Sequence, residues 1–240
     1  MLQHIFFDLD NTLMLSRTVM NAGHQPLFKE LCDKKDAIIV SGAQALQIEA
    51  QIPASIGAKF YVLGQTGNQA LDKDGKIIWQ ESFTKEQTDA TLALIEVIKK
   101  ELNLSVKDPH DLVELRGAQI SYSPIGHHED LQKKYDFDPG AQKRKQILSA
   151  HMSDVVHLNE LGVSVVPGGT TCFDFFLRGK NKGYNVLRLI KKEGWRPDEC
   201  VYVGDALFPG GNDETVLGVI PTHAVGGPDE TFVFVQSLLT

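Results

Sequence analysis

The stretch FFDLDNTL, residues 6–13, decides how the rest of the chain is interpreted. An apolar run from Ile5 to Phe7 leads into two aspartates, Asp8 and Asp10, that stand two positions apart. Such a run, ending in turn residues, predicts a buried strand, and alternation along that strand predicts that both carboxylates lie on one face. Two unpaired carboxylates so close would repel each other and raise one pKa, a conflict that a divalent cation removes.

The bulk composition sets limits on the class of protein. The 240 residues are 42% hydrophobic and carry a formal charge of −7, which suits a soluble chain with a sizeable core and no basic stripe for nucleic acid. No apolar run approaches the roughly 18 residues that span a bilayer, and no signal-like segment opens the chain. The three cysteines form no CxxC pair. We therefore expect a cytoplasmic protein with reduced thiols and with neither nucleic acid nor membrane as a partner.

Short apolar runs alternate with helical patterns at both ends of the chain, which predicts a parallel α/β core. The middle is different: an amphipathic helix from Thr84, an alternating strand over 112–126, a second helix from Asp138, and two strands joined at 167–169. This order indicates a small α+β unit on an antiparallel sheet. The expected organisation is a core over 1–81 and 180–240, with an inserted α+β domain over 82–179.

Polar groups follow several of the core strands. Ligands of an open α/β sheet bind at the carboxyl ends of its strands, where Asp8, Ser41 and Asp205 are expected. The run VYVGDALFPGGND, residues 201–213, adds Asp213, and Lys182 can offset the charge of a phosphate or of the acids. Oxygen ligands of this kind suit Mg²⁺, whose shell a substrate phosphate completes. The residues thus suggest a carboxylate nucleophile, a metal, a lysine and a hydroxyl.

These motifs carry a family resemblance. FFDLDNTL, Ser41, Lys182 and VGDALFPGGND resemble the four ordered motifs of the haloacid dehalogenase (HAD) superfamily of phosphoryl-transfer enzymes. ELRGAQISYSPIG at 114–126, GGTTCFDFF and GDALFPGGND resemble the eukaryotic-type phosphomannomutases and their prokaryotic relatives. The resemblance implies a Rossmann-like HAD core with a parallel sheet and an inserted α+β cap of type IIB.

The resemblance also implies roles for individual residues. Asp8 would be the nucleophile that forms an aspartyl-phosphate, and Asp10 the general acid/base. Ser41 would hydrogen-bond the transferring phosphoryl group, and Lys182 would neutralise it. Mg²⁺ would be held by Asp8, the main-chain carbonyl of Asp10, Asp205 and Asp213. The residues implied in substrate binding are Arg17, Arg116, Gly169, Asp174 and Asn212.

The chain departs from the family pattern at several positions. Asn11 stands where glycine is usual, and we expect it to adopt left-handed geometry. In the cap, His127 replaces an arginine, Lys133 or Lys134 replaces another, and Cys172 replaces a serine. Lysine and histidine hold phosphate less well than arginine does.

A mutase must hold phosphate at both ends of a bisphosphate intermediate, whereas a phosphatase need not. We therefore expect first a Mg²⁺-dependent phosphatase that acts on a small phosphorylated metabolite, a hexose phosphate. The alternative is a phosphomannomutase that interconverts mannose 1-phosphate and mannose 6-phosphate. For either enzyme a homodimer through the cap is a further prediction. A third hypothesis is a non-catalytic phosphosugar-binding protein, against which the intact Asp8, Asp10, Asp205 and Lys182 argue.

Overall fold

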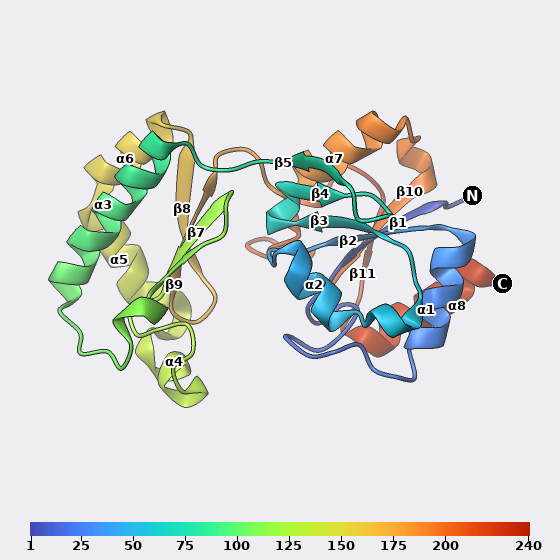
Figure 1. Cartoon of the computed structure of the whole chain (residues 1–240), viewed down its shortest axis with the longest axis horizontal. Coiled ribbons are helices and arrows are strands. Elements are labelled where there is room, and N and C mark those ends of the chain that lie inside the picture. The colour runs from blue at the N-terminus through green and yellow to red at the C-terminus, as the bar shows by residue number, and fades with distance from the viewer. The chain divides into compact units, whose positions relative to one another are not determined.

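The computed structural model describes residues 1–130 and 132–240 in full and only the backbone at position 131. The chain divides into two compact units (Figure 1). The core consists of Met1–Gln80 with Gly179–Thr240, and the cap consists of Glu81–Arg178. Each of the two boundaries between core and cap lies one residue before the boundary expected from the sequence.

The core contains one seven-stranded sheet, in the order β11-β10-β1-β2-β3-β4-β5. Its strands are β1 (His4–Asp8), β2 (Asp36–Val40), β3 (Tyr61–Gly64), β4 (Gln69–Leu71), β5 (Ile77–Gln80), β10 (Cys200–Gly204) and β11 (Thr222–Ala224). The five strands from β11 to β3 are parallel. Strands β4 and β5 form the antiparallel hairpin that Asp74 and Gly75 predict.

Helices cover both faces of this sheet. Strand β1 has apolar side chains on both sides, and each side needs a covering layer to be buried. Ile5 and Phe7 belong to the cluster that includes α1, α2 and α8, whereas Phe6 packs with α7 on the opposite face. The core helices are α1 (Gln25–Lys34), α2 (Ala45–Gln51), α7 (Lys182–Glu193) and α8 (Pro228–Leu239). Helix α8 has no side-chain cap at Gly227, and Pro228 removes one of the N–H donors that a cap would satisfy.

The cap has its own sheet and its own core. The sheet is antiparallel, in the order β6-β7-β9-β8. Its elements are α3 (Lys85–Leu102), β6 (Val113–Leu115), β7 (Gln119–Tyr122), α4 (Leu131–Phe137), α5 (Gln142–Ala150), α6 (Met152–Glu160), β8 (Val163–Gly168) and β9 (Cys172–Leu177). Phe173 and Phe175 on β9 pack with residues of the helices. Asp174 lies between them in the strand, so its side chain points to the other face of the sheet. Ser121 pairs with both Glu114 and Asp174 across the strands, and we call the face that carries these three residues the polar face of the cap sheet.

Several details of the cap differ from the sequence expectation. The segment 112–126 is a hairpin rather than one strand, because the chain reverses at Gly117, whose φ is 82°. The second expected helix begins only at Gln142, since Pro139 lies in a separate short turn, and α4 and α6 were not predicted as helices. Helix α3 begins, as expected, after Thr84, which forms a capping box with Gln87.

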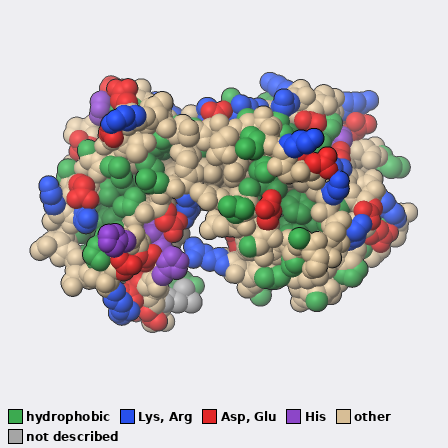
Figure 2. Space-filling model, in the orientation of Figure 1, with side chains coloured by type: hydrophobic (Ala, Val, Ile, Leu, Met, Phe, Trp, Pro, Cys, Tyr) green, Lys and Arg blue, Asp and Glu red, His purple; other side chains and the backbone are tan. Residues whose placement is uncertain are grey.

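Single helical turns connect several of these elements. They are Ala54–Ile56, Gln65–Gly67, Pro109–Asp111, Pro139–Ala141, Pro197–Glu199 and Glu214–Val216. None of the helices in the described part of the chain has the length and hydropathy of a membrane span. On the face shown in Figure 2, acidic and basic side chains are interspersed rather than gathered by sign. The expected fold class, a parallel α/β core with an inserted α+β cap, is confirmed.

Candidate active site

The candidate site lies in the core, at the carboxyl ends of three adjacent parallel strands. Strand β1 ends at Asp8, which pairs with Val40 on β2, and Ser41 follows directly. Strand β10, on the other side of β1, ends at Gly204, and Asp205 follows. Helix α7 begins at Lys182, which reaches the same strand ends. Parallel pairing thus gathers groups from four distant parts of the sequence.

A buried ion cluster occupies the centre of the site. The Lys182 ammonium donates to Asp8 Oδ1 at 2.5 Å and to Asp213 Oδ1 at 2.7 Å. The Tyr202 hydroxyl donates to the same oxygen of Asp213 at 2.6 Å. All four side chains are buried. A buried charge is tolerated only when it is paired and hydrogen-bonded in this way.

The electrostatics of the cluster leave an excess of negative charge. The pKa of Asp8 is raised to about 7: burial is the largest cause and Asp213 and Asp205 add to it, while Lys182 opposes the rise. Burial disfavours the charged form of Lys182, but Asp8 and Asp213 outweigh that effect and raise its pKa. Burial also raises the pKa of Tyr202 well above its usual value, so this group remains a hydroxyl donor. One ammonium therefore faces three acids.

The acids are close enough to share a cation. Asp8, Asp205 and Asp213 each offer an oxygen, and these oxygens lie within 4.8 Å of one another. The Thr12 hydroxyl lies 3.2 Å from Asp205 Oδ1 and accepts from the Asp205 N–H at 3.1 Å. Gly204 allows the close approach of Asp213, because a Cβ atom at this position would lie 2.4 Å from Oδ2 of Asp213.

The second aspartate of the opening motif has a different environment from the first. Strand β1 ends at Asp8, so strand alternation does not extend to Asp10, and the expectation of one shared face was wrong in that respect. Asp10 is half-buried, and its Oδ1 accepts from the backbone N–H of Arg17 at 2.7 Å. Asn11 has a φ of 61°, the left-handed geometry expected from the sequence.

The remaining predicted residues of the core are less tightly held. Ser41 is buried, and its Oγ accepts from the N–H of Ala43 at 3.1 Å, so its own hydroxyl proton can still be donated. Arg17 and Asn212 are exposed. Arg17 has a positive φ of 59° in the loop after the opening motif, and Asn212 directly precedes Asp213.

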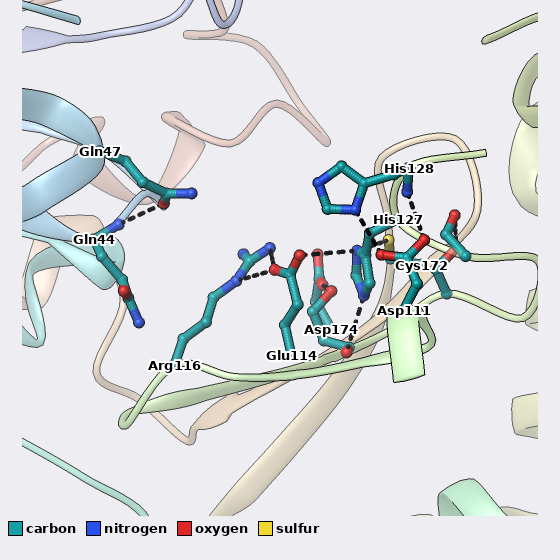
Figure 3. A network of polar contacts seen from close by, with 12 residues as sticks. Gln44, Gln47, Asp111, Glu114, Arg116, His127, His128, Cys172 and Asp174 are labelled. Atoms are coloured by element: carbon teal, nitrogen blue, oxygen red, sulfur yellow. Dashed lines mark hydrogen bonds and ion pairs between the residues drawn. The ribbon is translucent and has the colours of Figure 1, made fainter. Parts of the chain in front are cut away.

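The polar face of the cap sheet carries a second network, drawn in Figure 3. The Arg116 guanidinium donates through Nε and Nη2 to one oxygen of Glu114, and the other oxygen lies 3.7 Å from Nδ1 of His127. Burial raises the pKa of Glu114, but the contacts with Arg116 outweigh it and the pKa is lowered. Beside them, the Ser121 hydroxyl donates to Asp174 at 2.6 Å. Arg116 and Asp174, two of the residues predicted to bind substrate, therefore both belong to the polar face of the cap sheet.

The cap residues that depart from the family pattern lie around this network. His127 is buried, with Nε2 3.3 Å from the Ser121 carbonyl and Nδ1 3.9 Å from the Cys172 sulfur. The Lys134 ammonium donates to the main-chain oxygen of His127 at 2.7 Å, and Lys133 pairs with a glutamate at 3.7 Å. Each of these groups thus has a partner within the cap.

Sequence reasoning missed one buried cation altogether. A charged residue in a predicted helix is normally expected on a solvated face, but only 2% of Arg144 is exposed. Its guanidinium donates to Asp138 at 2.8 Å and to the carbonyls of Gly168 and Cys172 at 2.6 and 2.8 Å. It therefore holds the β8–β9 turn, where Gly169 is exposed. The available signal was its spacing of three residues from the apolar Ile147, which puts both on one helix face.

Thr12 and Tyr202 were quoted within motifs but received no role. For Tyr202 a signal existed, since alternation along β10 turns it away from Val201 and Val203. Such a tyrosine, two residues before a glycine and an acid, directs its hydroxyl towards the same strand ends. For Thr12 the contact with Asp205 depends on the pairing of β1 with β10, which local sequence does not reveal.

Solved structures of other proteins superpose on nearly the whole of this chain and share its fold. A haloacid dehalogenase-like hydrolase from Bacteroides thetaiotaomicron superposes with a TM-score of 0.71 at 12% identity, covering 99% of this chain and 100% of that one. The Plasmodium falciparum IMP-nucleotidase superposes with a TM-score of 0.70 at 16% identity, over 99% of this chain and 61% of that one. Fold and site together define a phosphoryl-transfer enzyme of the HAD class.

Sequence comparison narrows the class to a family. The model of the eukaryotic phosphomannomutase family matches residues 25–240, and the chain belongs to that family. A phosphomannomutase of Triticum aestivum is 29% identical over 239 residues, covering 94% of this chain and 90% of the relative. One of Galdieria sulphuraria is 30% identical over 252 residues, covering 97% and 92%. The resemblance stated from the motifs is confirmed, and these relatives support the mutase alternative better than the phosphatase expected first.

Proposed function

We propose that the chain is a Mg²⁺-dependent phosphomannomutase that transfers a phosphoryl group through Asp8. The observation that carries the proposal is the buried cluster of Asp8, Lys182 and Asp213 at the strand ends, in a chain that belongs to the phosphomannomutase family over residues 25–240. The substrate class is a hexose phosphate. The cytoplasmic location and a homodimer through the cap stay predictions.

The reaction proceeds in two half-reactions at the first motif. A carboxylate oxygen of Asp8 attacks phosphorus, the bond from phosphorus to the sugar oxygen breaks, and Asp10 gives its proton to that oxygen. A second sugar hydroxyl then gives its proton to Asp10 and attacks the aspartyl-phosphate, which releases the Asp8 carboxylate. The half-buried Asp10 suits proton exchange with a substrate better than the buried Asp8 does.

The other core residues position the group and balance its charge. The Lys182 ammonium already contacts Asp8, so it lies where a phosphoryl group bonded to Asp8 would develop negative charge. Ser41 retains a hydroxyl proton for a phosphoryl oxygen. Positioning and charge neutralisation are the main requirements of phosphoryl transfer.

The carboxylates fit a divalent cation. Asp8, Asp205 and Asp213 supply three hard oxygen ligands, and Lys182 offsets only part of their charge. We propose that these three residues and the main-chain carbonyl of Asp10 hold Mg²⁺. When bound, Mg²⁺ supplies positive charge to the phosphoryl oxygens.

A phosphatase is the second candidate, and the cap favours it through one observation. On the polar face of the cap sheet, Glu114 already pairs with the Arg116 guanidinium, and Lys134 is bonded to a main-chain oxygen. His127 is a weaker phosphate ligand than arginine. Arg17, Arg116, Gly169, Asp174 and Asn212 remain the proposed substrate contacts in either case.

One assay separates these candidates. Mannose 1-phosphate is supplied with and without a hexose bisphosphate activator, and both mannose 6-phosphate and inorganic phosphate are measured. A mutase forms mannose 6-phosphate when the activator is present and releases little phosphate. Release of phosphate without activator would assign hydrolysis instead, and no turnover of any sugar phosphate would favour a binding protein.

The nucleophile is tested by Asp8→Asn, which should abolish both reactions because an amide cannot form the aspartyl-phosphate. The matched control is Asp33→Asn, an exposed aspartate on α1, which should turn over like the wild type. Near-normal turnover by the Asp8 variant would contradict the proposed mechanism.

A further inference from the structure

A strained turn follows strand β3 in the core. Three consecutive residues, Gln65, Thr66 and Gly67, have positive φ angles of 53°, 57° and 87°. Residues other than glycine rarely adopt this geometry, and it persists only where the surroundings hold it. Gln65, Gly67 and the following Asn68 are buried. We call residues 65–68 the left-handed turn.

On one side the left-handed turn is bonded to the segment that follows β2. The Thr66 N–H donates to the carbonyl of Ser41 at 2.8 Å, and the Gln65 N–H donates to the carbonyl of Ala43 at 2.8 Å. The turn therefore fixes the main chain at the residue whose hydroxyl is proposed to hold the phosphoryl group.

On the other side it is bonded to the segment that leads into α7. Asn185, fully buried, donates from Nδ2 to the Thr66 carbonyl at 3.0 Å and to the carbonyls of Lys180 and Asn181, both at 3.2 Å. Asn68 Nδ2 donates to the same Lys180 carbonyl at 3.0 Å. The two amides thus fasten the turn to the residues directly before Lys182.

Gly67 allows the turn to lie against α7. A Cβ atom at this position would lie 2.3 Å from Cβ of Asn185, a distance that forces one of them to move. The Trp79 indole N–H donates to the Gly67 carbonyl at 2.9 Å and holds the turn from the hairpin side. Contact with α7 is therefore tight and fixed from two directions.

We propose that the left-handed turn is a brace that sets the spacing between Ser41 and Lys182, with Asn185 as the positioning residue. Ser41 and Lys182 come from different elements, yet both must meet one phosphoryl group. A misplacement of about 1 Å can cost roughly 100-fold in rate. The brace rests on the proposed function in one respect only, the roles given to Ser41 and Lys182.

The chain offers a matched pair of substitutions as a test. Gly67→Ala adds a methyl group where φ is 87° and Asn185 is in the way. Gly75→Ala adds the same group where φ is 75°, but no atom lies within 4 Å. Both variants incur backbone strain, and only the first pushes the brace away from α7. Asn185→Ala removes the three hydrogen bonds of the Asn185 amide without adding any atom.

Two measurements are made on folded protein, below the melting temperature of every variant: kcat for mannose 1-phosphate, and the affinity for inorganic phosphate by calorimetry. We expect Gly67→Ala and Asn185→Ala to lose at least tenfold in kcat and several-fold in phosphate affinity, and Gly75→Ala to match the wild type. A purely structural turn would lower stability in all variants and leave both quantities unchanged, which would overturn the proposal.

The phosphate measurement needs no turnover, so the brace is tested even if the substrate is a different phosphate ester. Equal phosphate affinity in Asn185→Ala and Gly75→Ala would overturn the brace, as would a wild type that binds no phosphate. Should Gly67→Ala fail to fold, Asn185→Ala carries the comparison alone. Turnover by Asp8→Asn would instead contradict the proposed function and leave the phosphate comparison standing.

Discussion

At the scale of single residues, the opening motif contains two aspartates with different surroundings. Asp8 is buried against Lys182, whereas Asp10 is half-buried outside the strand. The local sequence predicts the strand and the turn after it, including the left-handed Asn11. It does not predict the difference in environment, which depends on Lys182 arriving from a distant part of the chain.

Tyr202 provides a test of the cluster. Tyr202→Phe removes the hydroxyl that donates to Asp213 at 2.6 Å and leaves Asp213 bonded to Lys182. We expect a loss of about 1–2 kcal/mol in the free energy of unfolding, because a buried hydrogen bond is deleted. Mg²⁺ affinity should fall about tenfold, since a partner that orients a metal ligand is lost. Urea unfolding and Mg²⁺ titration measure both.

The control is Tyr61→Phe, which deletes a longer, partly exposed hydrogen bond to Glu193 at 3.4 Å. It should leave Mg²⁺ affinity unchanged. If the Tyr202 variant bound Mg²⁺ as tightly as the Tyr61 variant, Tyr202 would have no part in orienting Asp213.

At the scale of elements, sequence periodicity predicts the regular parts better than the connections. The runs that became β1, β2 and α3 have clear apolar patterns and lie where expected. The hairpin β6–β7 and the break before α5 were missed, because Gly117 and Gly140 reverse the chain with positive φ inside otherwise continuous patterns. The buried role of Arg144 was missed because its partners, apart from Asp138, lie on other elements.

The pair of Asp138 and Arg144 predicts a pH dependence of stability. Burial alone would raise the pKa of Asp138, but bonds from Arg144 and from two backbone N–H groups hold it below the ordinary value. A lowered pKa in the folded state stabilises the protein above the unfolded pKa of about 4, and this stabilisation is lost as the pH falls through the folded value. Breaking such a buried pair costs about 3–5 kcal/mol.

We therefore expect Asp138→Asn to lower the melting temperature markedly at pH 6 and less and less as the pH falls below about 4. Thermal unfolding followed by circular dichroism at a series of pH values measures this. The control is Asp198→Asn, which breaks an exposed pair with Arg196 and should stay close to the wild type throughout. A destabilisation by Asp138→Asn that is independent of pH would show that the carboxylate charge has no role.

At the scale of the whole molecule, the change of pattern in the middle of the sequence predicts an inserted domain, because helix and strand patterns there no longer follow the order of the core. The acids and the lysine of the site all belong to the core. The sequence pattern places Asp8 and Asp205 at the ends of strands, but it does not show that β1 and β10 are neighbours, and their proximity depends on that pairing.

The distribution of tryptophans makes the two units separable by experiment. Both tryptophans, Trp79 and Trp195, belong to the core, so tryptophan fluorescence reports on core unfolding, whereas far-UV circular dichroism reports on both units. We expect Mg²⁺ at about 100 times its Kd to stabilise the core by about 2.7 kcal/mol and to raise only the fluorescence midpoint.

The circular dichroism curve should then become biphasic. Asp213→Asn should remove the effect of Mg²⁺, because it deletes one of the three proposed carboxylate ligands. A Mg²⁺ effect that is equal in both signals, or that persists in the Asp213 variant, would contradict a metal site confined to the core acids.

The insertion has a consequence for the newborn chain. Strand β1 leaves the ribosome first, but its neighbour β10 lies beyond the entire cap, so at about 5–20 residues per second it waits on the order of ten seconds or more for its partner. The cap, a compact unit made of the continuous segment 81–178, can fold in that interval. Until the last quarter of these 240 residues emerges, Asp8 lacks Lys182, Asp205 and Asp213 as neighbours. The order of synthesis thus leaves the proposed nucleophile without these partners until residues 182–213 have been made.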